Sequence, residues 1–338
     1  MQIRGVLLVS LVLALLLGIP GTAQEKINGV SYVGQRDPIT PAHLQPVKDI
    51  HANWVTFMPF AFGEMNGSRL RHDNLRWQWW GETPEGINTC IKYANEHGLD
   101  VMIKPQIWFN HGAYTGHFEL DSEDQWREFE SDYFDYIMKF ALLSEEHHLP
   151  LLCIGTELTQ FAVQRESFWR MLIAEIRKVY KGKLTYAANW DSYERIGFWD
   201  VLDYVGVDAY FPVCEQRTPS LKAIMKGWQP HLRKLKSLSD REQRPILFTE
   251  WGYRSCDYCA HEPWDYTDDH QVNTSAQFNA YHAVFKLFWD QSWFAGGFLW
   301  KWFPEDELVG GPENNDFTPQ NKPVEELIAS WFLQTSAP

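Results

Sequence analysis

Two glutamates follow short apolar runs, at positions where a carboxyl group needs a chemical explanation. Glu250 follows one run in PILFTEWGY (Pro245–Tyr253), and Glu157 follows another in LLCIGTEL (Leu151–Leu158). Such runs are typical of strands buried on both faces of a parallel sheet, where a carboxylate is costly to desolvate unless it is paired. A structural ion pair would account for one such residue. Two of them in one chain indicate a pair of carboxyl groups that faces across one cleft.

The elements that position this pair alternate along the chain. Thr-Pro pairs at residues 40–41, 83–84 and 218–219 are typical helix starts, and Ser122 begins a capping box ahead of a long amphipathic run. The expected strands are Ile27–Gly34, Trp54–Phe60, Asp100–Ile107, Leu151–Glu157, Leu184–Trp190, Leu202–Tyr210, Pro245–Trp251 and Phe294–Trp302. This alternation predicts an α/β fold, a single (β/α)8 TIM barrel. The alternative, a doubly wound open sheet, normally has a glycine-rich phosphate loop after its first strand, and this sequence has none there.

Composition and charge narrow the class of protein. The 338 residues carry a net charge of −14, and no basic patch offsets it, which argues against a nucleic-acid partner. Residues 1–23 predict a secretory signal peptide, because Arg4 is their only charge and Gly21–Ala23 supplies small residues for cleavage. An uncleaved anchor is the alternative. We expect a catalytic domain over residues 24–338, secreted or periplasmic, monomeric and without a membrane span after cleavage.

The cysteines give no strong indication of a metal. Cys256 and Cys259 form a C-x-x-C pair with His261 close by, but a zinc site would need a fourth ligand. A disulfide or two unpaired thiols explain the pair better. We therefore expect no metal and no cofactor.

In a (β/α)8 barrel the chemistry lies at the C-terminal ends of the strands. Alternation places Lys104, Gln106 and Trp108 on one side of the third strand, facing the barrel interior or its mouth. Lys104 there either neutralises a buried acid or contacts a substrate. Further candidates at strand ends are Asn189, Trp190, Tyr210, Trp300 and Trp302. The second βα loop, from Ala61 to Glu82, is long for a barrel, and we expect Trp79 or Trp80 within it to line a distal subsite.

The aromatic residues indicate the substrate class. The chain has 17 tryptophans, several of them at predicted strand ends and in loops. A pyranose ring stacks its C–H face on indole, while amides and acids bind its hydroxyl groups, so such a cleft suits a neutral sugar. Two carboxyl groups also suffice for glycosidic cleavage, one as the acid and the other as nucleophile or base.

Several segments together resemble a known family. They are NGVSYVG (Asn28–Gly34), IGTELTQF (Ile154–Phe161), ANWD (Ala188–Asp191), VDAYFP (Val207–Pro212), FTEWGYRS (Phe248–Ser255), WKWFP (Trp300–Pro304) and DFTPQNKP (Asp316–Pro323). Glutamates after strands four and seven resemble clan A retaining glycoside hydrolases, and the details resemble glycoside hydrolase family 113, a family of β-mannanases.

The resemblance implies roles for individual residues. It implies that Glu157 is the acid/base, Glu250 the nucleophile, Tyr210 a hydrogen-bond partner of the nucleophile and Trp300 the floor beneath the sugar being cleaved. One position departs from the clan: Thr156 stands where most of its families carry the asparagine that binds the sugar 2-hydroxyl.

These observations together predict a secreted, retaining endo-β-1,4-mannanase that acts on a β-linked oligo- or polysaccharide. Alternatives are the same chemistry on another β-glycan, an exo-β-mannosidase, and a carbohydrate-binding barrel without catalysis. Retention of both Glu157 and Glu250 argues against the last, since a binding protein needs no acid at the leaving oxygen.

Overall fold

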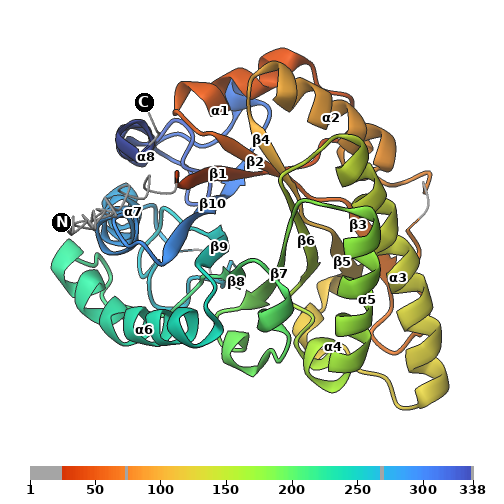
Figure 1. The fold of residues 1–338 in the computed structure, drawn as a ribbon. Helices are drawn as coiled ribbons and strands as arrows, with labels where there is room; N and C mark the ends of the chain where they lie inside the picture. The colour runs from red at the N-terminus through yellow and green to blue at the C-terminus, as the bar shows by residue number, and fades with distance from the viewer. Residues whose placement is uncertain (1–24, 73–74, 267–269, 336–338) are drawn as a thin grey trace, which may run out of the picture.

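The computed structural model describes residues 25–72, 75–266 and 270–335, and the predicted signal peptide, residues 1–23, lies outside them. Eight parallel strands form a closed barrel (Figure 1), which confirms the predicted (β/α)8 fold. In order around the barrel they are β1 (Ile27–Tyr32), β10 (Phe294–Trp302), β9 (Ile246–Trp251), β8 (Val205–Asp208), β7 (Lys183–Asn189), β6 (Leu151–Thr156), β4 (Asp100–Ile103) and β2 (Trp54–Phe57).

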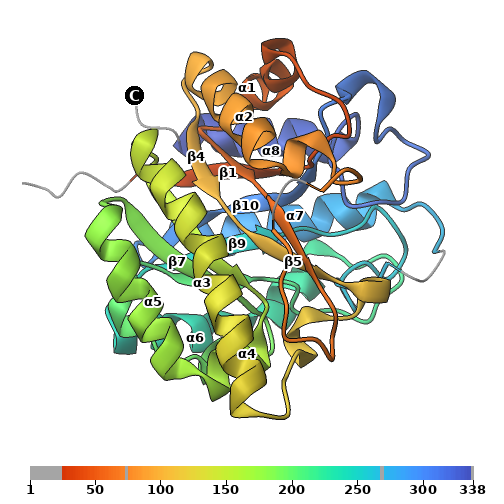
Figure 2. The ribbon, with the colours of Figure 1, turned by 90° about the vertical axis from the view of Figure 1, so that its right-hand side faces the viewer.

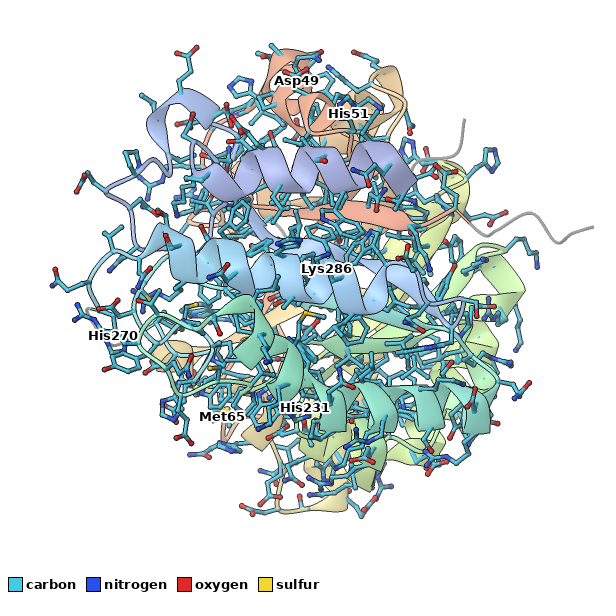
Figure 3. The ribbon with its side chains drawn as sticks, turned by 90° about the vertical axis from the view of Figure 1, so that its left-hand side faces the viewer. Asp49, His51, Met65, His231, His270 and Lys286 are labelled. Carbon is cyan, nitrogen blue, oxygen red and sulfur yellow. The ribbon has the colours of Figure 1, made fainter. Side chains whose placement is uncertain are left out.

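Helices surround this barrel. They are α1 (Gln45–Asp49), α2 (Pro84–Glu96), α3 (Glu123–Glu146), α4 (Thr159–Gln164), α5 (Glu166–Val179), α6 (Leu221–Glu242), α7 (Thr274–Phe288) and α8 (Pro323–Thr335). Short 3-10 helices lie at Pro41–Leu44, Trp80–Glu82, Asn110–Gly112, Thr115–His117, Tyr193–Arg195, Trp199–Val201 and Asp306–Leu308. Helices α3 and α5 lie along one side of the barrel (Figure 2), and α6, α7 and α8 cover another, where His231 and Lys286 mark α6 and α7 (Figure 3).

The predicted helix starts are confirmed at two caps and shifted at a third. The Thr83 hydroxyl accepts a hydrogen bond from the Gly86 N–H, and the Ser122 hydroxyl accepts one from the Gln125 N–H. The helix expected after residues 218–219 begins later, because Ser220 is the residue whose side chain caps α6.

No helix in the described ranges is long and apolar enough to cross a membrane.

The third predicted strand is divided in two. Strand β4 stops at Ile103, and β5 (Gln106–Phe109) pairs with β3 (Phe60–Gly63) in a separate two-stranded sheet. Phe57 pairs with Ile103 before the break and Phe60 pairs with Gln106 after it, so the register is unchanged and Pro59 lies opposite Pro105. Pro59 has no N–H to donate to this ladder, although the Lys104 N–H still donates to the Phe57 carbonyl and the Gln106 N–H to the Pro59 carbonyl, both at 2.9 Å. The expectation of a continuous strand from Asp100 to Ile107 is therefore wrong, as is that of a loop throughout residues 61–82.

Candidate active site

A cavity of about 700 Å³ lies at the C-terminal ends of the barrel strands. This volume is within the range of small-molecule binding sites. Eight of the predicted site residues line it: Gln106, Trp108, Glu157, Asn189, Trp190, Tyr210, Glu250 and Trp300. The two glutamates identified from separate apolar runs thus share one cavity.

Three donors converge on the carboxyl group of Glu250, which is 6% exposed at the end of β9. The Tyr210 hydroxyl donates to Oε2 at 2.9 Å. Lys104 donates to Oε1 and forms an ion pair with it, and the Gln106 amide donates to the same oxygen at 3.4 Å. These contacts hold the carboxyl group in one orientation and supply an ionised carboxylate with partners for both oxygens.

Lys104 also binds a second buried acid. Its ammonium group lies 3.2 Å from Asp208 Oδ2, and both side chains are fully buried. Burial lowers the pKa of Lys104, but the negative charges of Asp208 and Glu250 outweigh this and raise it above its ordinary value. Burial and the charge of Glu250 raise the pKa of Asp208 to about 7, although Lys104 and the Thr249 hydroxyl, which donates to Oδ1 at 2.7 Å, oppose the shift. Of the two predicted roles of Lys104, the structure shows the neutralisation of buried acids.

The surroundings of Glu157 differ from those of Glu250. Within the described ranges no side chain donates a hydrogen bond to its carboxyl group. Burial raises the pKa of Glu157 well above the usual range, the negative charges of Asp208 and Glu250 raise it further, and Lys104 opposes them. A carboxyl group in such a place retains its proton at pH values where an ordinary glutamate is ionised.

The backbone at Glu157 departs from strand geometry. Strand β6 ends at Thr156, and Glu157 has a φ of 53°, in the left-handed region that residues other than glycine seldom occupy. The Glu157 N–H donates to the Ala187 carbonyl at 2.8 Å, and the Glu157 carbonyl accepts a hydrogen bond from the Thr115 hydroxyl at 3.3 Å. Strained backbone of this kind is frequent at functional sites. Here the strained residue is one that lines the cavity.

Polar side chains near Glu157 form hydrogen bonds with neighbouring protein groups. The Asn189 amide donates to the Tyr114 hydroxyl at 2.6 Å and its oxygen accepts from the Trp190 N–H at 2.8 Å. The Thr156 hydroxyl donates to the Pro105 carbonyl at 3.3 Å. Thr156 therefore uses its one proton on the backbone and offers a ligand only acceptor capacity.

Aromatic side chains line two regions of the cavity. Trp108, on β5, is 54% exposed. Trp190 and Trp264 stack on each other with ring centroids 4.8 Å apart and an interplanar angle of 17°. Trp300, on β10, also lines the cavity, and its peptide bond to Lys301 is cis. Flat aromatic faces in a cavity with paired acids suit stacking against a ring-shaped, uncharged ligand.

Three predicted site residues lie elsewhere. Trp302 is fully buried and packs in the core, so the expectation that it contacts substrate is wrong. Trp79 and Trp80 do not line the cavity with the glutamates; Trp80 packs against the core and borders a small separate cavity beside α2. The second loop folds back against residues 35–36: the Trp80 N–H donates to the Arg36 carbonyl, and the Gly81 N–H donates to the Gln35 carbonyl.

Sequence reasoning missed three residues of this site. Asp208 stood at a predicted strand end, but its link to Lys104 depends on which strands face each other across the barrel. Tyr114 lines the cavity from a segment with no motif of its own, and Asp191, the last residue of the ANWD segment, also lines it. Asp191 directly follows the strand-end pair Asn189–Trp190, a position that could have indicated it.

The cysteine pair is separate from the glutamates. Cys256 and Cys259 are buried and unpaired, and they border a second cavity of about 310 Å³ with His261. Across the described residues, no group of three or more histidine, cysteine or acidic side chains is arranged to hold a metal ion. Of the two explanations for the C-x-x-C pair, the structure shows unpaired thiols.

Comparison with known proteins identifies one matching family and several solved structures with a similar fold. The model of glycoside hydrolase family 113 matches residues 35–322. A β-mannanase of that family from Alicyclobacillus acidocaldarius is 24% identical, with a TM-score of 0.81 over 92% of this chain and 98% of that chain. A second β-1,4-mannanase of the family is 22% identical, with a TM-score of 0.79 over 91% and 99% of the two chains. A β-glucuronidase from Faecalibacterium prausnitzii is 12% identical, with a TM-score of 0.58 over 93% and 50%. No curated protein matches the sequence.

Proposed function

Because this chain belongs to glycoside hydrolase family 113, we propose that it is a retaining endo-β-1,4-mannanase that hydrolyses β-mannan-type polysaccharides. One observation carries the mechanism: two glutamates share a cavity and have opposite surroundings. Three donors hold Glu250, whereas no described side chain donates to the carboxyl group of Glu157, whose pKa is raised. Paired acids in contrasting environments are the usual mark of an acid and a nucleophile in one site.

In the first step, a carboxylate oxygen of Glu250 attacks the anomeric carbon of the sugar. The glycosidic bond breaks, its electron pair goes to the leaving oxygen, and Glu157 donates its proton to that oxygen. In the second step, the ionised Glu157 takes a proton from water, and the water oxygen displaces Glu250 from the anomeric carbon. Two inversions at one carbon retain its configuration.

The contacts around Glu250 suit both steps. Tyr210 and Lys104 orient its two oxygens for attack. When the ester forms, Glu250 loses its negative charge, and Asp208 then remains as a counter-ion for Lys104. The buried lysine is therefore paired throughout the cycle, which avoids the large cost of an isolated buried charge.

The remaining predicted residues are proposed to bind sugar. Trp300 would form the floor beneath the sugar being cleaved, with Trp108 and Trp190 as stacking surfaces and Gln106 and Asn189 as polar contacts. Support for endo action comes from topology. Strands β4 and β9 are four places apart in either direction around the barrel. Trp108 lies on β5 beyond β4, and Trp264, which follows β9, stacks on Trp190 after β7, so aromatic surfaces from several strands line the cavity.

A product profile tests this proposal. We expect the wild-type protein to cleave β-1,4-mannan and manno-oligosaccharides into mixtures of short oligosaccharides, and to leave cello-oligosaccharides of equal length nearly intact. Glu250→Gln is the inactive control. Faster cleavage of the cello series would indicate another β-glycan as the substrate, release of mannose alone would indicate exo action, and binding without cleavage would indicate a non-catalytic barrel.

We propose further that the protein is made with a signal peptide over residues 1–23 and acts as a secreted or periplasmic monomer. The apolar composition of that segment supports this proposal. A polysaccharide substrate is consistent with action outside the cell.

A further inference from the structure

The two-stranded sheet β3–β5 leads away from Glu250. At its inner end Phe60 pairs with Gln106, whose amide donates to Glu250 Oε1 at 3.4 Å. Both strands run outward from the barrel, and the next residues on the same face, two positions on, are Phe62 and Trp108, which also pair. The face that begins at the nucleophile therefore continues to a pair of aromatic side chains.

Trp77 extends this aromatic face. Its ring meets that of Phe62 edge to face, with centroids 4.3 Å apart and an interplanar angle of 74°. Phe62 is 9% exposed, whereas Trp77 is 56% and Trp108 is 54% exposed. Phe62 is thus the buried base on which Trp77 rests, beside its strand neighbour Trp108. The indole rings of Trp77 and Trp108 thus expose apolar surface to solvent, and covering that surface with a ligand would lower the free energy.

The loop that carries Trp77 is fastened to the same sheet. The Gln78 amide donates to the Phe60 carbonyl at 3.0 Å and to the Glu82 carbonyl at 3.2 Å. Backbone hydrogen bonds in both directions join Phe62 to Arg71 at 2.8 and 2.9 Å. The position of Trp77 next to Phe62 is therefore set by contacts on both sides of it in sequence, and the platform exists before any ligand binds.

We propose that Trp77 and Trp108, supported by Phe62, form a distal sugar-binding platform that extends the cavity outward from Glu250. The ligand is a β-linked glycan chain long enough to reach beyond the sugars at the glutamates. This inference rests on the proposed function for the identity of the glycan. It moves the distal subsite predicted at Trp79 or Trp80 to Trp77, because only Trp77 of these three packs on the face that leads to the nucleophile.

The test compares Trp77→Ala with Trp79→Ala. Trp79 is a matched control because it is 41% exposed in the same loop, and within the described ranges it makes no contact with another aromatic ring. For Trp77→Ala we expect kcat/KM to fall about two- to tenfold on long oligosaccharides, the range of one aromatic stacking contact, and to be unchanged on the shortest substrate. Trp77→Phe should recover part of the loss, and Trp79→Ala should match the wild-type protein.

Affinity electrophoresis in gels that contain soluble β-mannan, or another β-glycan that retards the wild-type protein, separates this inference from the proposed function, since it needs no catalysis. Weaker retardation of Trp77→Ala but not of Trp79→Ala would support the platform even if no bond were cleaved. Equal loss of activity on long and short substrates would show that Trp77 merely packs the loop. Equal effects of the two alanine variants, or no retardation of the wild-type protein by any β-glycan, would also overturn the inference.

Discussion

Glu157 and Glu250 have identical side chains, and the groups around them separate their chemistry. Glu250 has three donors, whereas Glu157 lies where burial and two neighbouring carboxylates favour its protonated form. Asp191 is exposed and lines the same cavity, and its negative charge adds to that effect on the pKa of Glu157. Asp191 therefore offers a way to alter Glu157 without disturbing the buried network.

We predict that Asp191→Asn moves the alkaline limb of the pH profile of kcat/KM to lower pH. The negative charge of Asp191 raises the pKa of Glu157, so its removal lets Glu157 lose its proton at lower pH, and activity falls there. The shift should be less than about one pH unit and should shrink in 1 M salt, where the screening length is about 3 Å. Asp121→Asn, which removes an exposed acid outside the cavity, is the control. A shift to higher pH would mean that Glu157 is not the group that titrates.

The sequence pattern alone identified both glutamates, because burying a carboxylate at the end of an apolar strand costs free energy unless the carboxylate is paired. It could not identify Asp208 as a partner of Lys104, since the two are distant in sequence and meet only inside the barrel. It also misplaced Trp302. Side-chain alternation indicates which residues share a side of a strand, but not which of them the surrounding loops and helices will cover.

At the scale of elements, the ends of β4 and β9 meet across the barrel. These strands are four places apart in either direction, and Lys104 follows the first while Glu250 lies on the second. Asp208, at the end of β8, completes the group. One buried cation thus joins three strands at the level of the active site.

We predict that Lys104→Met lowers the free energy of unfolding by about 3–5 kcal/mol at pH 7, the usual cost of removing one partner of a buried ion pair. Asp208 and Glu250 would then face each other without a cation. The deficit should shrink as the pH falls through about 7, the raised pKa of Asp208, because protonation of Asp208 removes its negative charge. Urea unfolding at pH 7 and pH 5 measures it, with Lys236→Met as the control, whose exposed pair with Asp240 should contribute less than about 1 kcal/mol. A loss as small as that of the control would contradict the structural role of Lys104.

The elements themselves were largely predictable. Strong periodicity located the strands, and caps such as Thr83 and Ser122 located helix starts. The division between β4 and β5 was not foreseen, because the apolar pattern continues through Pro105. At the break Pro105 lies opposite Pro59, which has no N–H for the ladder, and such a match across two strands requires knowledge of the register.

For the whole molecule, closure of the barrel brings residues far apart in the chain into one site. Eight strands alternating with helices favoured this architecture from the sequence, and the family match covers residues 35–322. The shape of the cavity depends on the conformations of the loops, and the turn residues in the sequence predict those conformations poorly. This is why the two glutamates that share the cavity could be located from sequence, whereas the contact of Trp77 with Phe62 could not.

The central claim is that Glu250 attacks the sugar while Glu157 acts as acid and base. A 2-deoxy-2-fluoro mannosyl fluoride needs little acid assistance and slows breakdown of the ester, so the intermediate accumulates on the nucleophile. Mass spectrometry of peptides from the inactivated protein should find one fluorosugar, on the peptide that contains Glu250, and Glu157→Gln should still be labelled. Label on the peptide that contains Glu157, or labelling of Glu250→Gln to the same extent as the wild-type protein, would contradict the account.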